Sequence, residues 1–132
     1  MDWVPEFSRR ARGFAVYAAL RSLGRTGLAE LVERTCGCAR RFADGIVELE
    51  GVELINDVVL NQVLFRFESD VRTDEVLKAV QEAGDVWMSG TTWNGRRAIR
   101  VSVSNWQTTD EEIELALQSF RAAVQPAQAP AR

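Results

Sequence analysis

The chain has 132 residues, of which 46% are hydrophobic, and its 16 basic and 19 acidic side chains give a formal net charge of −3. This length suffices for one hydrophobic core, and the charge balance lacks the basic excess of nucleic-acid-binding proteins. No apolar run approaches the roughly 20 residues of a membrane-spanning helix, and the N-terminus lacks the basic and apolar regions of a signal peptide. We therefore expect a cytoplasmic protein with neither nucleic acid nor membrane as a partner.

Two helices and two strands are predicted in the first half of the chain. Ser8 is a candidate N-cap for a helix that Gly24 ends. A second helix is expected at residues 26–49, because apolar side chains recur there at steps of three and four residues. Branched and aromatic residues then predict strands at residues 52–55 and 63–67.

A third helix and a hairpin follow. Thr73 is the predicted N-cap of this helix, and Gly84 its predicted end. Asn94-Gly95 supplies the two positive-φ residues of a type I′ turn, and therefore predicts a hairpin with strands at residues 86–93 and 97–103.

The last predicted helix opens with a capping box formed by Thr109 and Glu112. The expected order is α-α-β-β-α-β-β-α. Hairpin-linked strands with helices between the pairs indicate an α+β fold, in which helices cover one face of a three- to four-stranded, mainly antiparallel sheet. We expect one domain at residues 1–125 and a disordered, Ala/Gln/Pro-rich tail at residues 126–132.

The first helix is apolar on all sides between residues 14 and 20. A helix of this kind needs cover all round, although alanine-rich turns also tolerate exposure. The prediction is an interface, with another copy or with a further part of the protein, that includes Phe14 and Tyr17. Arg9 and Arg10 stand at the start of this helix, where the macrodipole disfavours positive charge, and we assign them to the same interface.

The numbers of histidine, lysine and cysteine residues limit the kinds of catalytic and metal site that the chain can form. The chain has no histidine and one lysine, Lys78, which excludes histidine-based catalysis and the common zinc patterns, so no catalytic residue or metal ligand is assigned. Cys36 and Cys38 point about 200° apart on a helix and are expected to be reduced, partly buried thiols. The three tryptophans around the hairpin are expected to pack in the core or at a domain interface: Trp87, Trp93 and Trp106.

Three stretches, in this order, resemble group II pyridoxal-phosphate-dependent decarboxylases, the family of the aromatic-amino-acid, glutamate and 2,4-diaminobutyrate decarboxylases. They are residues 5–25 (PEFSRRAR, the apolar helix and LGR), residues 56–64 (NDVVLNQVL), and residues 89–106 (SGTTW and RVSVSNW around the turn). The resemblance covers about residues 2–124 and implies the C-terminal small domain of a fold-type-I enzyme.

In such an enzyme a larger N-terminal domain carries the Schiff-base lysine and a histidine that stacks on the cofactor. The resemblance thus implies a lyase of amino-acid metabolism that acts as a homodimer on an amino-acid substrate and uses pyridoxal phosphate in the complete enzyme. Lys78 has Asp74 and Glu82 four residues away on either side, which predicts a solvated, ion-paired lysine. We therefore expect this chain alone to hold no cofactor and to be inactive.

Arg100 is the candidate substrate-binding residue. It alternates with Ile99 and Val101 in a predicted strand, so it lies on the face opposite the core-facing residues. The residues alone fit either a solvated charge or a binding site at this position. By resemblance, an arginine at this place binds a substrate carboxylate, for which the planar guanidinium is well suited.

An alternative function stays open, namely a free-standing α+β module that binds a ligand or dimerises without enzymatic activity. The identity of the amino acid also stays open, as does a different pyridoxal-phosphate reaction such as aminotransfer.

Overall fold

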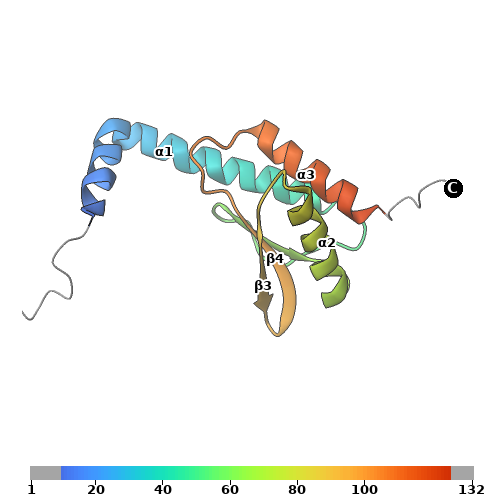
Figure 1. Cartoon of the computed structure of the whole chain (residues 1–132). Helices are drawn as coiled ribbons and strands as arrows, with labels where there is room; N and C mark the ends of the chain where they lie inside the picture. Colours follow the sequence, from blue (N-terminus) through green and yellow to red (C-terminus); the bar gives the residue numbers. More distant parts are fainter. Residues whose placement is uncertain (1–9, 126–132) are drawn as a thin grey trace, which may run out of the picture. The chain divides into compact units, whose positions relative to one another are not determined.

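The computed structural model describes residues 10–125, which form three helices and four strands (Figure 1). The chain divides into two compact units, one up to Val32 and one from Glu33 onward. The predicted helix cap Ser8 and the predicted tail at residues 126–132 lie outside the described residues. None of the helices in the described range combines the length and the apolar character that crossing a bilayer requires.

Helix α1, Arg12–Ile46, is interrupted at Gly24, whose φ of 63° and ψ of −170° are not helical. Glycine adopts this positive φ without the steric penalty of a Cβ. The predicted break between two helical segments is therefore confirmed, although no separate loop follows it. The second segment ends at Ile46 rather than at residue 49.

The second unit contains the sheet and two further helices. Its strands are β1 (Glu53–Leu54), β2 (Gln62–Arg66), β3 (Ser89–Trp93) and β4 (Arg96–Ser102), and its helices are α2 (Asp70–Ala83) and α3 (Asp110–Val124). The strand order is β1-β2-β4-β3, and all three pairings are antiparallel. The expected α+β fold with an antiparallel sheet is confirmed.

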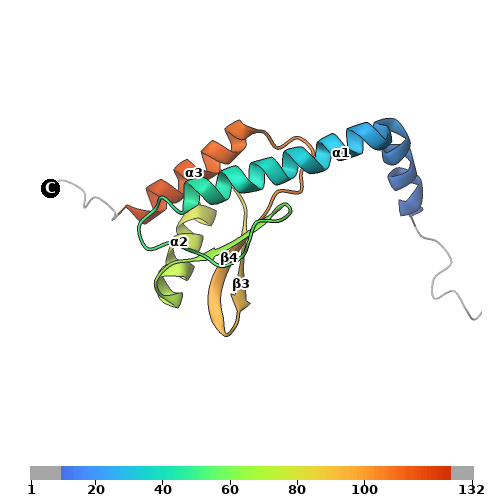
Figure 2. The same ribbon diagram turned by 180° about the vertical axis from the view of Figure 1, so that it is seen from behind.

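The core of the second unit lies on one face of the sheet. Phe42 of α1, Phe65 of β2 and Phe120 of α3 have ring centroids 5.4 to 5.9 Å apart, and all three side chains are fully buried. Val76 and Ile99 bring α2 and β4 into the same cluster. Within this unit the end of α1, α2 and α3 therefore cover one side of the sheet (Figure 2).

The start of α2 differs from the prediction. Ser69 is the N-cap, and its Oγ accepts a hydrogen bond from the Arg72 N–H at 3.1 Å. Thr73 lies inside the first turn, where its Oγ1 donates to the Ser69 carbonyl oxygen at 2.8 Å and accepts from the Phe67 N–H at 3.0 Å. Thr73 is buried, so its hydroxyl joins the strand end to the helix instead of capping the helix.

The other local signals are confirmed. Gly84 ends α2 with a φ of 80°, and Asn94 and Gly95 both have positive φ in the β3–β4 turn. At the start of α3 the Glu112 carboxylate accepts a hydrogen bond from the Thr109 N–H at 2.7 Å and a second from the Thr109 hydroxyl. Both bonds favour the charged carboxylate and lower the pKa of Glu112.

A substitution at Gly45 of α1 tests the packing between α1 and α3. A Cβ at this position would clash with the methyl groups of the buried Leu117, so we expect Gly45→Ala to lower the free energy of unfolding by about 1–3 kcal/mol. Urea denaturation of the purified chain measures the change.

Gly37→Ala is the matched control in the same helix, because a Cβ there meets no atom within 4 Å. Alanine is a better helix former than glycine, so this substitution should raise the free energy of unfolding by about 0.5–1 kcal/mol. A Gly45→Ala chain as stable as Gly37→Ala would contradict the described contact between the helices.

Candidate functional site

The site lies on the face of the sheet that the helices leave open. Arg100 of β4 stands opposite Leu64 of β2 and Ser89 of β3. Since side chains in a strand alternate between the two faces, the burial of Ile99 places Arg100 on the open face, where it is exposed. The predicted orientation of Arg100 is therefore confirmed, whereas its role as a substrate ligand stays a prediction.

A hollow of about 300 Å³ surrounds this arginine. Its lining residues come from β2, β3, β4 and the segment after β1: Asn56, Gln62, Leu64, Thr91, Trp93 and Arg100. None of these six described residues carries a carboxylate, and Arg100 is the charged residue among them. The lining combines one cation with neutral polar and apolar groups, and the guanidinium supplies both the charge and the donors that a small anion needs.

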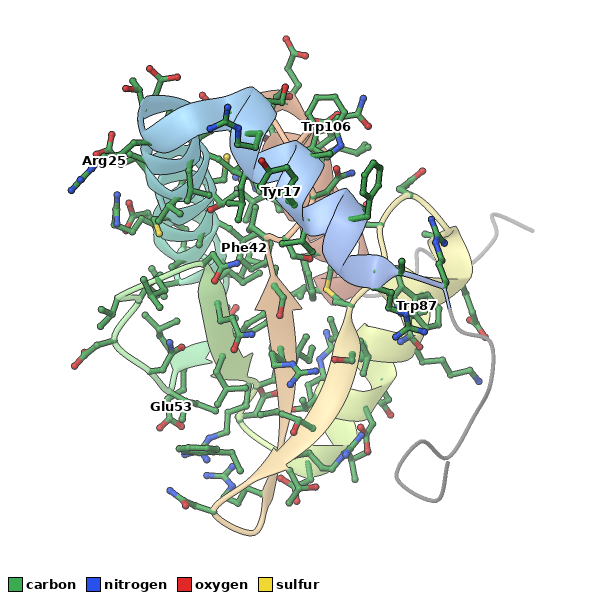
Figure 3. The ribbon with its side chains drawn as sticks, turned by 90° about the vertical axis from the view of Figure 1, so that its left-hand side faces the viewer. Tyr17, Arg25, Phe42, Glu53, Trp87 and Trp106 are labelled. Atoms are coloured by element: carbon green, nitrogen blue, oxygen red, sulfur yellow. The ribbon has the colours of Figure 1, made fainter. Side chains whose placement is uncertain are left out.

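Three of the four strand arginines are neutralised by nearby carboxylates. Arg66 donates two hydrogen bonds of 2.8 Å to Glu53, which Figure 3 labels, and Arg97 donates to Asp74 at 2.9 Å. The Asp74 carboxylate, through its hydrogen bond and its charge, raises the pKa of Arg97. The third, Arg96, pairs with Asp70 at 3.8 Å.

Arg100 is the exception in this group. Among the described residues no group lies within hydrogen-bond or ion-pair distance of its guanidinium. A guanidinium offers five N–H donors in a planar fork that matches a carboxylate. The open face of the sheet thus presents one cation whose hydrogen-bonding capacity is unused.

The wall of the hollow beside β2 is fixed by Asn56. Its Oδ1 accepts a hydrogen bond from the Leu64 N–H at 2.7 Å, and its Nδ2 donates to the carbonyl oxygen of Gln62 at 3.2 Å. Asn56 therefore continues the pairing of β1 with β2 through its side chain. Sequence reasoning assigned no role to Asn56 or Gln62, because their position beside Arg100 depends on which strands pair.

The predicted interface residues lie in the first unit. Phe14 and Tyr17 are exposed by 76% and 62% on the first segment of α1, and Arg10 is exposed at the start of the described residues. Arg9 lies outside that range. The exposure of two aromatic side chains agrees with a surface that another body covers, but the partner stays a prediction.

The three tryptophans are not core residues. Trp87, Trp93 and Trp106 are exposed by 79%, 50% and 67%, and Figure 3 labels the first and the last of them. The core alternative of that prediction is wrong, because the helices fill the buried face of the sheet with phenylalanine and aliphatic side chains. The alternative of a domain interface stays a prediction. Trp93 instead lines the hollow beside Arg100.

The two cysteines are free, as predicted, but they are buried rather than partly buried. Burial raises the pKa of the Cys38 thiol, and the carboxylate of Asp110 adds to this effect. Because the thiolate is the reactive form, Cys38 is suited to packing rather than to nucleophilic chemistry. Within residues 10–125 no group of three cysteine or acidic side chains is arranged to hold a metal ion.

Comparison with protein families gives a match to one model, the pyridoxal-dependent decarboxylase conserved domain, over residues 1–68 of the 132. The chain belongs to the pyridoxal-dependent decarboxylase family. The match covers slightly more than half of the chain.

Individual members of this family extend the similarity over most of the chain. Tyrosine decarboxylase 2 of Arabidopsis thaliana is 25% identical over 125 residues, which cover 89% of this chain and 23% of the relative. Histidine decarboxylase of Drosophila melanogaster is 28% identical over 114 residues, which cover 86% of this chain and 14% of the relative. This chain thus spans a quarter or less of the length of these curated relatives.

A solved structure shows the same fold. Tryptophan decarboxylase of Catharanthus roseus, crystallised in complex with L-tryptophan, superposes with a TM-score of 0.80 at 19% sequence identity. The superposition covers 93% of this chain and 28% of the plant enzyme. At this identity the likeness establishes the fold and leaves substrate and assembly open.

The described residues do not fit a covalently held pyridoxal cofactor. A Schiff-base lysine needs burial or cationic neighbours that favour the neutral amine. Lys78 has neither, because its side chain is 74% exposed and its Nζ lies 3.7 Å from the Glu82 carboxylate. The predicted pair with Glu82 is present, whereas Asp74 pairs with Arg97 instead.

The exposure of Lys78 predicts the outcome of cofactor labelling. The purified chain, mixed with one equivalent of pyridoxal phosphate and reduced with borohydride, should retain no stoichiometric cofactor by mass spectrometry. Lys78→Gln is the control and should give the same spectrum. One cofactor per chain, attached to Lys78 and lost in Lys78→Gln, would contradict the description of this helix face.

Proposed function

We propose that this chain is the C-terminal domain of a pyridoxal-phosphate-dependent amino-acid decarboxylase, a carboxy-lyase whose N-terminal domain holds the cofactor. The chain contributes Arg100 to substrate binding and the first segment of α1 to the domain and dimer interface, and it is not active alone. Family membership supports the class of chemistry, and the exposure of Lys78 supports placing the cofactor on a different domain.

The main support for the proposal is that the guanidinium of Arg100 lies in the hollow without a carboxylate partner among the described residues. Exposed arginines are common, but here each neighbouring strand arginine is neutralised by a carboxylate. A carboxylate in this hollow would receive two charge-assisted hydrogen bonds from the guanidinium. An amino acid supplies such a carboxylate, so the site chemistry and the family chemistry agree.

The interface part of the proposal is supported by the first segment of α1. Besides Phe14 and Tyr17, it exposes the aliphatic side chains of Val16 and Leu20 by 58% and 47%. Burial of one such side chain contributes about 1.5–3 kcal/mol, so this segment is stabilised by a covering partner. The N-terminal domain and a second subunit of a homodimer are the partners that the proposal names.

Removal of the Arg100 charge tests the binding role. In the complete enzyme, with the amino acid that it decarboxylates fastest, we expect Arg100→Gln to reduce kcat/KM by about 10- to 100-fold, mainly through KM. The reason is the loss of a hydrogen-bonded charge that binds the carboxylate. Arg100→Lys keeps the charge without the bidentate geometry and should lose less. Steady-state kinetics measure both variants.

Lys78→Gln is the matched control, because it removes one positive charge from an exposed position on the opposite, helical side of the sheet. It should leave both kinetic constants unchanged. Equal kinetics for Arg100→Gln and the wild type would overturn the assignment of Arg100 and with it the proposed contribution of this domain to substrate binding.

A further inference from the structure

Gln62, the first residue of β2, has a side-chain amide that is not used within the described part of the chain. Its backbone carbonyl accepts the hydrogen bond from Asn56, but the side-chain Oε1 and Nε2 have no partner among residues 10–125. The side chain is exposed and lines the same hollow as Arg100.

The strand register places Gln62 and Arg100 as diagonal neighbours on the open face. Leu64 stands opposite Arg100, and Gln62, two residues earlier in β2, stands opposite Ser102. Residues two apart in a strand share a face, and diagonal neighbours in an antiparallel pair lie about 7–8 Å apart between Cα atoms, within reach of long side chains. The amide and the guanidinium can therefore contact the same small ligand.

On the β2 side of the hollow, Gln62 has the neutral hydrogen-bond donor that no other described group uses. Asn56 uses both its Oδ1 and its Nδ2 in bonds to the backbone, and Leu64 has no polar group. Thr91 and Trp93 approach from β3, on the other side of Arg100. A carboxylate bound by the fork of Arg100 still has lone pairs to satisfy, and Gln62 faces them from β2.

We propose that Gln62 is a second substrate-binding residue, whose side-chain N–H donates a hydrogen bond to the carboxylate that Arg100 binds. This inference rests on the proposed function. An amide suits the position because it adds a donor without adding charge. A glutamate there would neutralise Arg100 and repel an anionic ligand.

Two substitutions of nearly constant size test the role of Gln62 in the complete enzyme. Gln62→Leu removes the hydrogen bond and should raise KM by about 3- to 30-fold, with kcat within about twofold of the wild type. Gln62→Glu adds a negative charge beside Arg100 and should raise KM further. The residue is exposed, so both variants should keep the thermal midpoint of the wild type, measured by circular dichroism.

Ser102→Ala is the matched control, because Ser102 pairs with Gln62 on the same face and does not line the hollow. It should leave KM unchanged. In the Arg100→Gln background, Gln62→Leu should raise KM by a smaller factor than in the wild type, since two residues that bind one carboxylate are coupled.

The results separate this inference from the proposed function. Unchanged kinetics in Arg100→Gln would overturn both. A raised KM in Arg100→Gln, together with an unchanged KM in Gln62→Leu and Gln62→Glu, would overturn the role of Gln62 alone. If Gln62→Leu raises KM by the same factor in the wild type and in Arg100→Gln, the claim that both residues bind the same carboxylate is overturned.

Discussion

The packing of Phe42, Phe65 and Phe120 decides which face of the sheet is buried, and the rest of the site depends on that choice. Their rings meet at 5.4 to 5.9 Å between α1, β2 and α3. Because strand side chains alternate, the burial of Phe65 turns Leu64 to the opposite face, and the pairing of β2 with β4 sets Arg100 beside it. A one-residue slip in this register would move Arg100 into the core, where an unpaired charge is strongly destabilising.

The two faces of the sheet consequently have different roles. The helical face is filled with apolar side chains, whereas the open face carries a hollow with one unneutralised cation. A family of pyridoxal-dependent enzymes needs a lysine for the cofactor, and Lys78 lies exposed on α2, on the helical side of the sheet. The separation of Lys78 from the hollow is consistent with the proposal that this domain binds substrate and that another domain holds the cofactor.

Local signals in the sequence predicted the helices, strands and turns well. Features that depend on contacts between distant residues were predicted less well. Gly84 and Asn94-Gly95 act through their own backbone conformations, so they could be recognised without knowledge of the fold. Thr73 was misassigned because two nearby hydroxyl residues can cap α2, and the choice of Ser69 depends on where β2 ends. Trp93 was expected to be buried or in an interface, since hydrophobicity alone does not distinguish a core side chain from one that lines a ligand site.

The most direct test of the account is a crystal structure of the complete enzyme with an unreactive carboxylate analogue of its substrate. The measurement is the distance between the Arg100 guanidinium nitrogens and the carboxylate oxygens of the analogue. The account predicts two contacts of about 2.7–2.9 Å, as in bidentate arginine–carboxylate pairs. An Arg100 side chain that faces bulk solvent, or that pairs with a carboxylate of the protein while the analogue binds elsewhere, would contradict it.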